Sequence, residues 1–121
     1  MKTFGEFYDA VSTWAKEVGN ANAQIMLEDW MKLVSPEKWA EARVAEFNEG
    51  YFRGFVEDMT TSVQRVVGWA ETDEHYKIVL DEGHAFLKAI AEIGRQYGIA
   101  VKDEEIDTAL SFSEALVRNQ S

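Results

Sequence analysis

Apolar residues recur at helical spacing along most of the chain, and this feature restricts the possible folds more than any other. The first series runs from Phe4 through Val11 to Val18, and at ~100° per residue its members share one narrow stripe. No apolar series has the alternating pattern of a half-buried β-strand. Proline, which interrupts helices, occurs once, at Pro36. The pattern therefore predicts a protein built mainly of long helices.

Residues that start and stop helices divide this pattern into segments. Thr3 and Glu6 have the spacing of a capping box, so they predict the start of a first helix that ends at Gly19-Asn20. A second helix is predicted over residues 21–34, and the short connection implies that the two helices are antiparallel. The side chains expected to be buried from the second helix are Met26, Leu27, Trp30 and Leu33.

A third helical pattern begins at residues 35–38, where serine can cap and proline suits the first helical position. It continues to about Trp69, which gives about 34 residues and a length of ~50 Å. Because glycine weakens helix interiors, we expect a kink near Gly50 or Gly54 in one continuous helix. The alternative is two helices joined near residues 48–50.

A fourth helix is predicted from Thr72 or Asp73 to Tyr97, where Gly98 can close it. Within it, residues 76–80 are rich in β-branched and aromatic residues and are followed by Asp-Glu-Gly. This segment could instead form a strand and a turn.

A fifth helix is predicted to begin at residues 102–105, where three acidic side chains complement the positive end of a helix dipole. Its apolar stripe would consist of Ile106, Leu110, Leu116 and Val117. Since the chain has 121 residues and no linker or repeat, we expect residues 1–121 to form one domain. The predicted fold class is all-α, a single-domain bundle of about five helices.

The chain is strongly acidic, with 22 Asp and Glu against 12 Lys and Arg and a formal net charge of −10. Direct binding to nucleic acid is not expected, because neutralising phosphates requires clustered basic side chains. The same charge suits a protein partner with a basic surface. It also keeps a small protein in solution, which is the simpler interpretation.

Cysteine is absent, which excludes disulfides, thiol nucleophiles and cysteine-based metal sites. This composition fits a reducing compartment, and the acidic, amphipathic start of the chain is unlike a signal peptide. No segment approaches the ~18 apolar residues of a membrane span. We therefore expect a cytoplasmic protein that does not enter a membrane and needs no cofactor.

One face of the third helical pattern carries charged side chains. At ~100° per residue Glu46, Glu49, Arg53 and Glu57 fall on one side, opposite the apolar stripe. Arg53 follows Glu49 by four residues and precedes Glu57 by four, so it can screen both acids in an exposed ladder. The simplest interpretation is a solvated helix face without metal.

A second interpretation starts from two acid pairs, Glu46-x-x-Glu49 and Glu71-x-x-Glu74. The spacing is similar to the magnesium-binding pattern of all-α nucleoside triphosphate pyrophosphohydrolases. The resemblance covers these four residues and implies carboxylates on two facing helices that hold a metal and a triphosphate. The second pair of that family ends in aspartate, whereas this one ends in Glu74.

The two histidines give no catalytic constellation. Asp81 and His84 have the spacing of a metal-ligand pair, but His84 is expected to face solvent, opposite the apolar stripe of its helix. His75 is expected to pack its ring at the helix start. No serine lies in a nucleophile elbow, and no glycine-rich phosphate loop is present.

Trp39 is out of phase with the apolar stripe of its helix and falls on the side of Glu46 and Arg53. Either a neighbouring helix covers this ring, or it anchors a partner within the acidic surface. Most other aromatic side chains are expected in the core.

These observations favour a non-enzymatic interaction protein, of inhibitor or adaptor type, that binds a basic surface of a protein partner. The expected contact residues are Trp39, Glu46, Glu49, Arg53 and Glu57. In composition the chain is similar to many small phage-encoded proteins that occlude host machinery. The alternatives are a magnesium-dependent nucleotide hydrolase and a homodimeric structural subunit.

Overall fold

The computed structural model describes residues 2–109 and 111, and these residues fold as an all-α bundle. The named helices are α1 (Phe4–Val18), α2 (Ala21–Leu33), α3 (Pro36–Val44), α4 (Glu49–Gly68) and α5 (Asp73–Gln96). Residues 103–109 form a further helix, called the terminal helix below. No strand occurs among the described residues, so the predicted fold class is confirmed with one helix more than expected. The predicted apolar positions 110, 116 and 117 lie outside the described residues.

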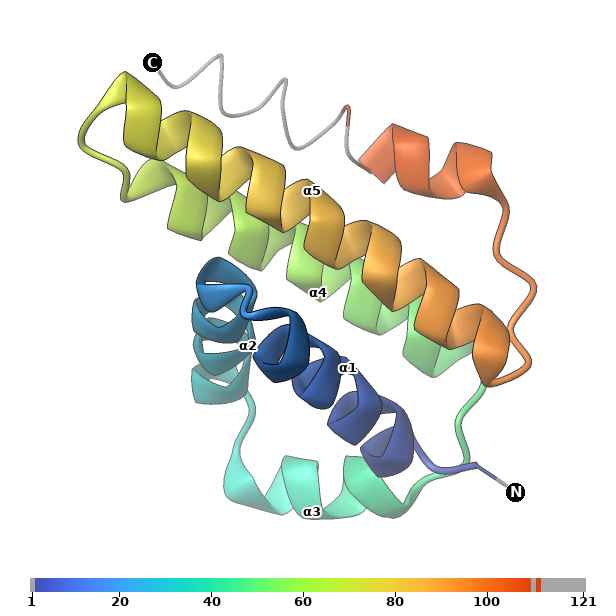
Figure 1. The fold of residues 1–121 in the computed structure, drawn as a ribbon. Coiled ribbons are helices and arrows are strands. Elements are labelled where there is room, and N and C mark those ends of the chain that lie inside the picture. Colours follow the sequence, from blue (N-terminus) through green and yellow to red (C-terminus); the bar gives the residue numbers. More distant parts are fainter. Residues whose placement is uncertain (1, 110, 112–121) are drawn as a thin grey trace.

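Helices α4 and α5 form a long antiparallel pair at the centre of the molecule (Figure 1). Helix α2 packs against both of them, and α1 packs against α2, α3 and α5. The chain turns back after α5, so that the terminal helix lies on the other side of α5 from α1 (Figure 1). The bundle therefore has α5 near its middle, with short helices at its edges.

The helix starts that the sequence predicts are confirmed. The side chains of Thr3, Ser35 and Thr72 each accept a hydrogen bond from a backbone N–H three residues further on, at 3.1–3.2 Å. These bonds satisfy donors that a helix cannot satisfy internally. Gly19 ends α1 in the left-handed conformation, with φ of 71°, which glycine adopts without steric cost.

The predicted continuous helix from residue 36 to about 69 is wrong. Helix α3 ends at Val44 and α4 begins at Glu49, so the alternative of two helices is the observed one. Gly50 and Gly54, where a kink was expected, lie within α4 and do not interrupt it. The break therefore has a cause other than the weakness of glycine.

That cause is a contact with the beginning of the chain. The Phe4 N–H donates to the Ala45 carbonyl at 3.0 Å, and the Phe47 N–H donates to the Lys2 carbonyl at 2.8 Å. These bonds hold residues 45–47 extended and bury the Phe47 ring. The Asn48 side chain then caps α4. Residues 45–48 thus give up helical hydrogen bonds for tertiary ones.

Helix α5 is continuous through residues 76–80, so the alternative of a strand and a turn there is wrong. The last residue of the supposed turn, Gly83, is buried against α4 and α2. A Cβ atom at this position would lie 2.8 Å from Val63 and 3.2 Å from Met26. Glycine therefore serves close helix packing here rather than a turn.

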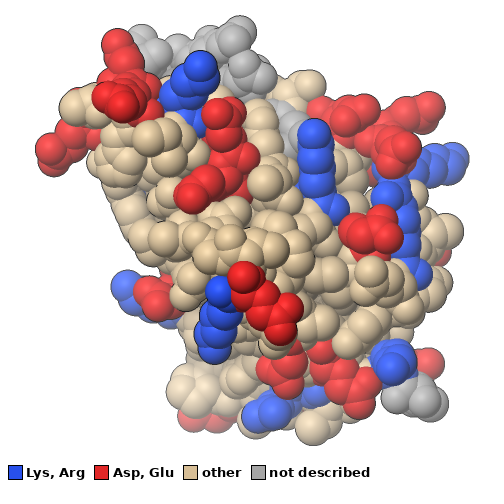
Figure 2. Space-filling model, viewed as in Figure 1, with Lys and Arg blue, Asp and Glu red and all other residues tan. Residues whose placement is uncertain are grey.

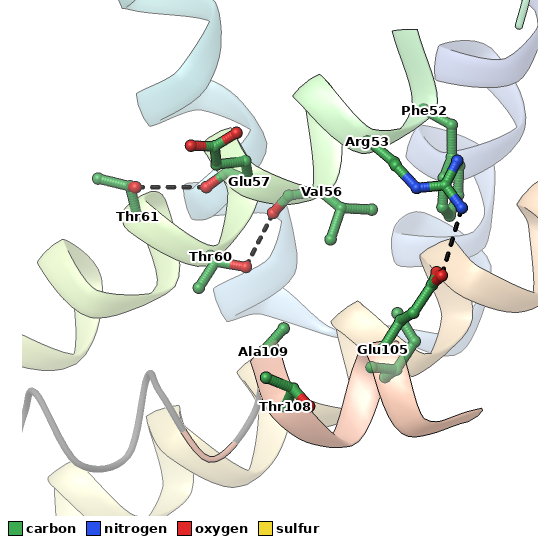
Figure 3. Close-up of a pocket in the computed structure, with 10 residues that line it drawn as sticks. Phe52, Arg53, Val56, Glu57, Thr60, Thr61, Glu105, Thr108 and Ala109 are labelled. Carbon is green, nitrogen blue, oxygen red and sulfur yellow. Dashed lines mark hydrogen bonds and ion pairs between the residues drawn. The ribbon is translucent and has the colours of Figure 1, made fainter. Parts of the chain in front are cut away.

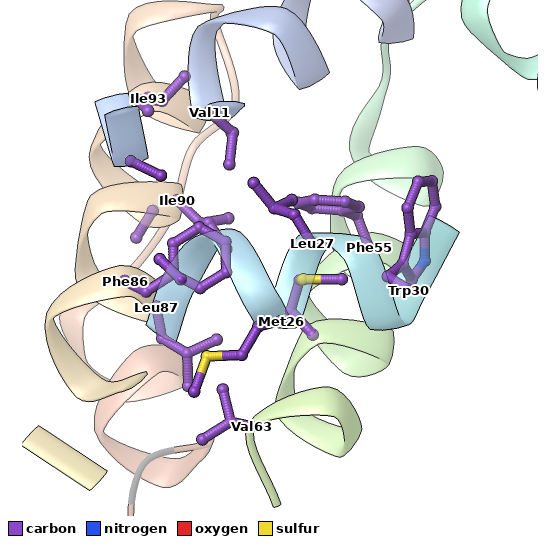
Figure 4. Close-up of a cluster of buried hydrophobic side chains, with 14 of the residues drawn as sticks. Val11, Met26, Leu27, Trp30, Phe55, Val63, Phe86, Leu87, Ile90 and Ile93 are labelled. Carbon is purple, nitrogen blue, oxygen red and sulfur yellow. The ribbon is translucent and has the colours of Figure 1, made fainter. Parts of the chain in front are cut away.

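The core combines aliphatic and aromatic side chains from α1, α2, α4 and α5 (Figure 4). The terminal helix adds Ile106, whereas α3 has no fully buried residue. Phe7, Met26, Met59 and Phe86 are completely buried. The prediction for Leu33 is wrong: its side chain is 68% exposed, because it occupies the last position of α2. Among the described residues, no helix combines the length and apolar character needed to cross a membrane.

Candidate interaction surface

The α4 outer face consists of Glu49, Arg53 and Glu57, and all three side chains are exposed, as predicted. Arg53 pairs with Glu49 at 3.2 Å, which confirms this part of the ladder. Its second ion pair crosses to Glu105 on the terminal helix at 3.3 Å, rather than to Glu57. Within the described residues the Glu57 carboxylate has no ion pair or hydrogen bond. The face is therefore net negative, with Glu57 open to a ligand.

A groove of about 630 Å³ lies next to this face, between α4 and the terminal helix, and is called the α4 groove below. Its floor includes Phe52 and Val56 from α4 (Figure 3). Ile106 lines it from the terminal helix. Arg53 and Glu57 stand on its α4 rim, and Glu105 stands on the opposite rim. The volume lies within the range of small-ligand sites in proteins.

The terminal helix is held in place by Arg95 of α5. The Arg95 Nε donates to the Val101 carbonyl at 3.0 Å, and a terminal nitrogen donates to Asp103 at 2.7 Å. The hydrogen bond to Asp103 is the main cause of a raised Arg95 pKa, so this guanidinium stays charged. Ile106 is only 5% exposed, so it fixes the middle of the terminal helix against the bundle. Together these contacts set the position of one wall of the groove.

Acidic side chains gather over the terminal helix in the surface view, at the upper right (Figure 2). Elsewhere on this face acidic and basic side chains are mixed (Figure 2). The terminal helix carries Asp103, Glu104, Glu105 and Asp107, all exposed. Negative charge is thus concentrated beside the α4 groove.

Glu46 does not lie on the α4 outer face, because residues 45–48 are not helical. It is exposed, as expected, but it forms an isolated antiparallel bridge with Thr3. The prediction that Glu46 and Glu49 share one helix face is therefore wrong. The break between α3 and α4 separates them.

Trp39 is half-buried and packs among other rings, which is the first of the two places expected for it. Its ring centroid lies 4.9 Å from that of Tyr8, 5.8 Å from Trp30 and 6.0 Å from Phe4. Helices α1 and α2 therefore cover much of this side chain. A contact between Trp39 and a partner stays a prediction. The tryptophan that is more than half exposed is Trp69, at 57%.

The two acid pairs do not meet. Glu49 begins α4, whereas Glu71 and Glu74 follow its end. Since α4 has 20 residues, the pairs are separated by ~30 Å. Among the described residues no three acidic or histidine side chains are grouped so that they could hold a metal ion. The facing carboxylates that the pyrophosphohydrolase resemblance implies are therefore not formed by Glu46, Glu49, Glu71 and Glu74.

His84 does not face solvent, so that prediction is wrong. It is half-buried on α5, and its Nε2 atom is buried without a hydrogen-bond partner. His75 is exposed in the first turn of α5. Since neither histidine has an acidic or hydroxyl partner among the described residues, neither forms a catalytic pair.

The sequence did not reveal the α4 groove. The sequence places Ile106 in the apolar stripe of the fifth predicted helix and Glu105 at the start of that helix, with no sign that this helix lies beside residues 52–56. The groove can be seen only when the terminal helix is placed beside α4, because the side chains of the two helices do not fill the space between them.

Comparison with known proteins gives no relative from which a function could be transferred: no protein family, curated protein or solved structure matches this chain.

Proposed function

We propose that this protein is a non-enzymatic interaction protein, of inhibitor or adaptor type, that binds a basic surface of a protein partner. The observation that carries the proposal is the open Glu57 carboxylate beside the apolar α4 groove, in a chain of net charge −10. Opposite charge speeds the encounter of two proteins, and desolvated apolar contacts slow their separation. The α4 outer face and the groove together offer both contributions.

The contact residues in this proposal are Glu49, Arg53 and Glu57, with the groove floor as the apolar part. The floor takes the role that the sequence assigned to Trp39, whose ring packs between helices. Charge on the rim acts through a field screened over ~8 Å at physiological ionic strength. The association rate should therefore fall as salt is added.

Affinity capture from the native host, with mass spectrometry of the captured proteins, tests the proposal. The bait is compared with the variants Glu57→Lys and Glu41→Lys, which change the net charge equally. Glu41 is exposed on α3 and belongs neither to the α4 outer face nor to the lining of the α4 groove. We expect a partner with a basic surface that Glu57→Lys loses and Glu41→Lys retains. Equal loss with both variants, or triphosphate hydrolysis by the purified protein, would contradict the proposal.

A further inference from the structure

The α4 groove has the length of a short helix. Phe52, Val56 and Thr60 follow one another at intervals of four residues along its α4 side. Eight residues of helix span ~12 Å, which corresponds to about two turns. Apolar side chains spaced three or four residues apart on a partner helix would therefore match this floor in period and in length.

The polar atoms of the groove mostly accept hydrogen bonds. The hydroxyls of Thr60, Thr61 and Thr108 each donate to a backbone carbonyl four residues earlier, at 2.8, 3.3 and 2.8 Å. Their protons are therefore already used within their own helices. The guanidinium of Arg53 is engaged by two carboxylates. The groove therefore favours a ligand that supplies hydrogen-bond donors over a ligand that supplies only acceptors.

The negative charge of the groove rim also favours a ligand with hydrogen-bond donors. The guanidinium of Arg53 is paired with the carboxylates of Glu49 and Glu105. The Arg53–Glu105 pair and the carboxylate of Glu57 both belong to the groove lining (Figure 3). Glu105 and Arg53 close one end of the groove, while Glu57 stands further along α4 without a partner among the described residues. An anionic ligand would be repelled here. Lysine or arginine side chains would find acceptors on both rims.

Both walls of the groove are helices, and this decides the backbone form of the occupant. The interior of a helix has no free N–H or C=O groups, so an extended peptide would bury unpaired backbone groups against these walls. A helical peptide satisfies its own backbone and presents only side chains. The walls therefore select a helix over a strand.

We propose that the α4 groove binds a short amphipathic helix of the partner, which seats apolar side chains against the half-buried Val56, beside the buried Phe52 and Ile106, and brings lysine or arginine to Glu57 and Glu105. This inference rests on the proposed function and specifies the form of the partner.

The test uses the full chain and a synthetic helix-forming peptide of about 14 residues, with leucines on one face and lysines on the other. Fluorescence anisotropy measures affinity, and amide chemical shifts in NMR spectra locate the site. We expect the shifts to cluster on α4 and the terminal helix. Glu57→Lys and Val56→Glu should each weaken binding by on the order of tenfold, and Glu41→Lys should change it little. Circular dichroism confirms that each variant is folded, and Glu57 is exposed in any case.

Two control peptides separate the contribution of the apolar face from that of the lysine charges. One has the same composition with its leucines spread around the helix, and the other has glutamate in place of lysine. Binding of either control as tight as that of the first peptide would overturn the inference, as would shifts centred on another face. A dimer of the free protein that Val56→Glu dissociates would assign the groove to a second copy and overturn it too.

The outcomes also separate this inference from the proposed function. If the peptide fails to bind but Glu57→Lys still loses a captured basic partner, the groove inference is wrong and the proposed function stands. If capture also fails to depend on Glu57, both are wrong.

Discussion

Helix α4 makes an arginine–carboxylate contact on each of two sides, and the two contacts differ in burial. Toward α2, Arg65 binds Asp29 at 2.6 Å, and the Asp29 side chain is 14% exposed. Toward the terminal helix, Arg53 binds Glu49 and Glu105 at 3.2 and 3.3 Å, with side chains 40–65% exposed. The residue types are alike, so the surroundings account for the difference between the two contacts.

The contact with α2 is partly buried at the edge of the core. Ser62, which is fully buried, donates to the same Asp29 oxygen at 2.9 Å, and Arg65 also donates through Nε at 3.0 Å. Trp30 of α2 donates to Asp58 of α4 at 3.0 Å nearby along the same pair of helices. Removing one partner of such a cluster leaves buried polar groups unsatisfied, whereas exposed ion pairs exchange readily with water. Stability should depend on the Asp29 cluster, and the Arg53 contacts should be free to change when a partner binds.

The largest expected effect is on the free energy of unfolding of Asp29→Ala. We expect a loss of about 2–3 kcal/mol, because Ser62 and Arg65 lose their shared acceptor. Urea unfolding followed by circular dichroism measures it. Glu28→Ala, at the exposed neighbouring position of α2, is the control and should change stability by less than ~0.5 kcal/mol. Equal losses in the two variants would show that burial does not distinguish these carboxylates.

Stability should also depend on pH through Asp29. Burial raises the pKa of this carboxyl, but hydrogen bonds from Arg65 and Ser62 outweigh burial and hold the pKa below its ordinary value. A lowered folded-state pKa stabilises the protein fully above the unfolded value of ~3.9, and this stabilisation is lost as pH falls through the folded value. In urea titrations at falling pH, Asp29→Asn should lose less stability below pH ~4 than the parent protein. Parallel curves for the two proteins would contradict this assignment.

A smaller effect is expected for Ser62→Ala. The substitution removes one hydrogen bond to Asp29 without creating a large cavity, so we expect a loss of about 1 kcal/mol. Thr61→Ala is a matched control, because this exposed hydroxyl donates only to its own helix. If Ser62→Ala causes no further loss of unfolding free energy in the Asp29→Ala variant, the Ser62 hydroxyl stabilises the protein only through Asp29.

The smallest effect is expected for Glu105→Gln, at less than ~0.5 kcal/mol, because its ion pair with Arg53 is exposed. Thermal unfolding at low and high salt measures it, and salt should reduce even this small difference. A loss above ~1 kcal/mol would mean that the pair holds the terminal helix in place. Arg53 would then be a structural residue, and the two sides of α4 would no longer differ in kind.

The helices themselves could be predicted because their signals are local. A cap such as Thr3, Ser35 or Thr72 acts within one turn, and an apolar stripe reports the buried face of its own helix. The exposure of Glu49 and Arg53 followed from the same periodicity. These properties depend on neighbours within four residues along the chain, so the sequence displays them directly.

The candidate site could be predicted only in part. Glu49, Arg53 and Glu57 lie together as expected, but Glu46 is separated from them by the break after α3. The break depends on hydrogen bonds from the first residues of the chain, more than forty positions away. The helical periodicity of the sequence contains no information about such a distant contact. Because the break was not foreseen, the periodicity also placed Trp39 on the same side as the acidic residues of α4.

The amino-acid sequence by itself determined an all-α fold, most helix ends, the net charge and the exposed carboxylates of α4. The tertiary structure alone decided that Trp39 is covered while Trp69 is exposed, that His84 is half-buried, and that α4 and the terminal helix leave a groove. Local hydrogen bonding and periodicity act between close neighbours in the chain. Burial, helix breaks and grooves depend on which distant segments fill the same space, and those choices are made only when the helices pack.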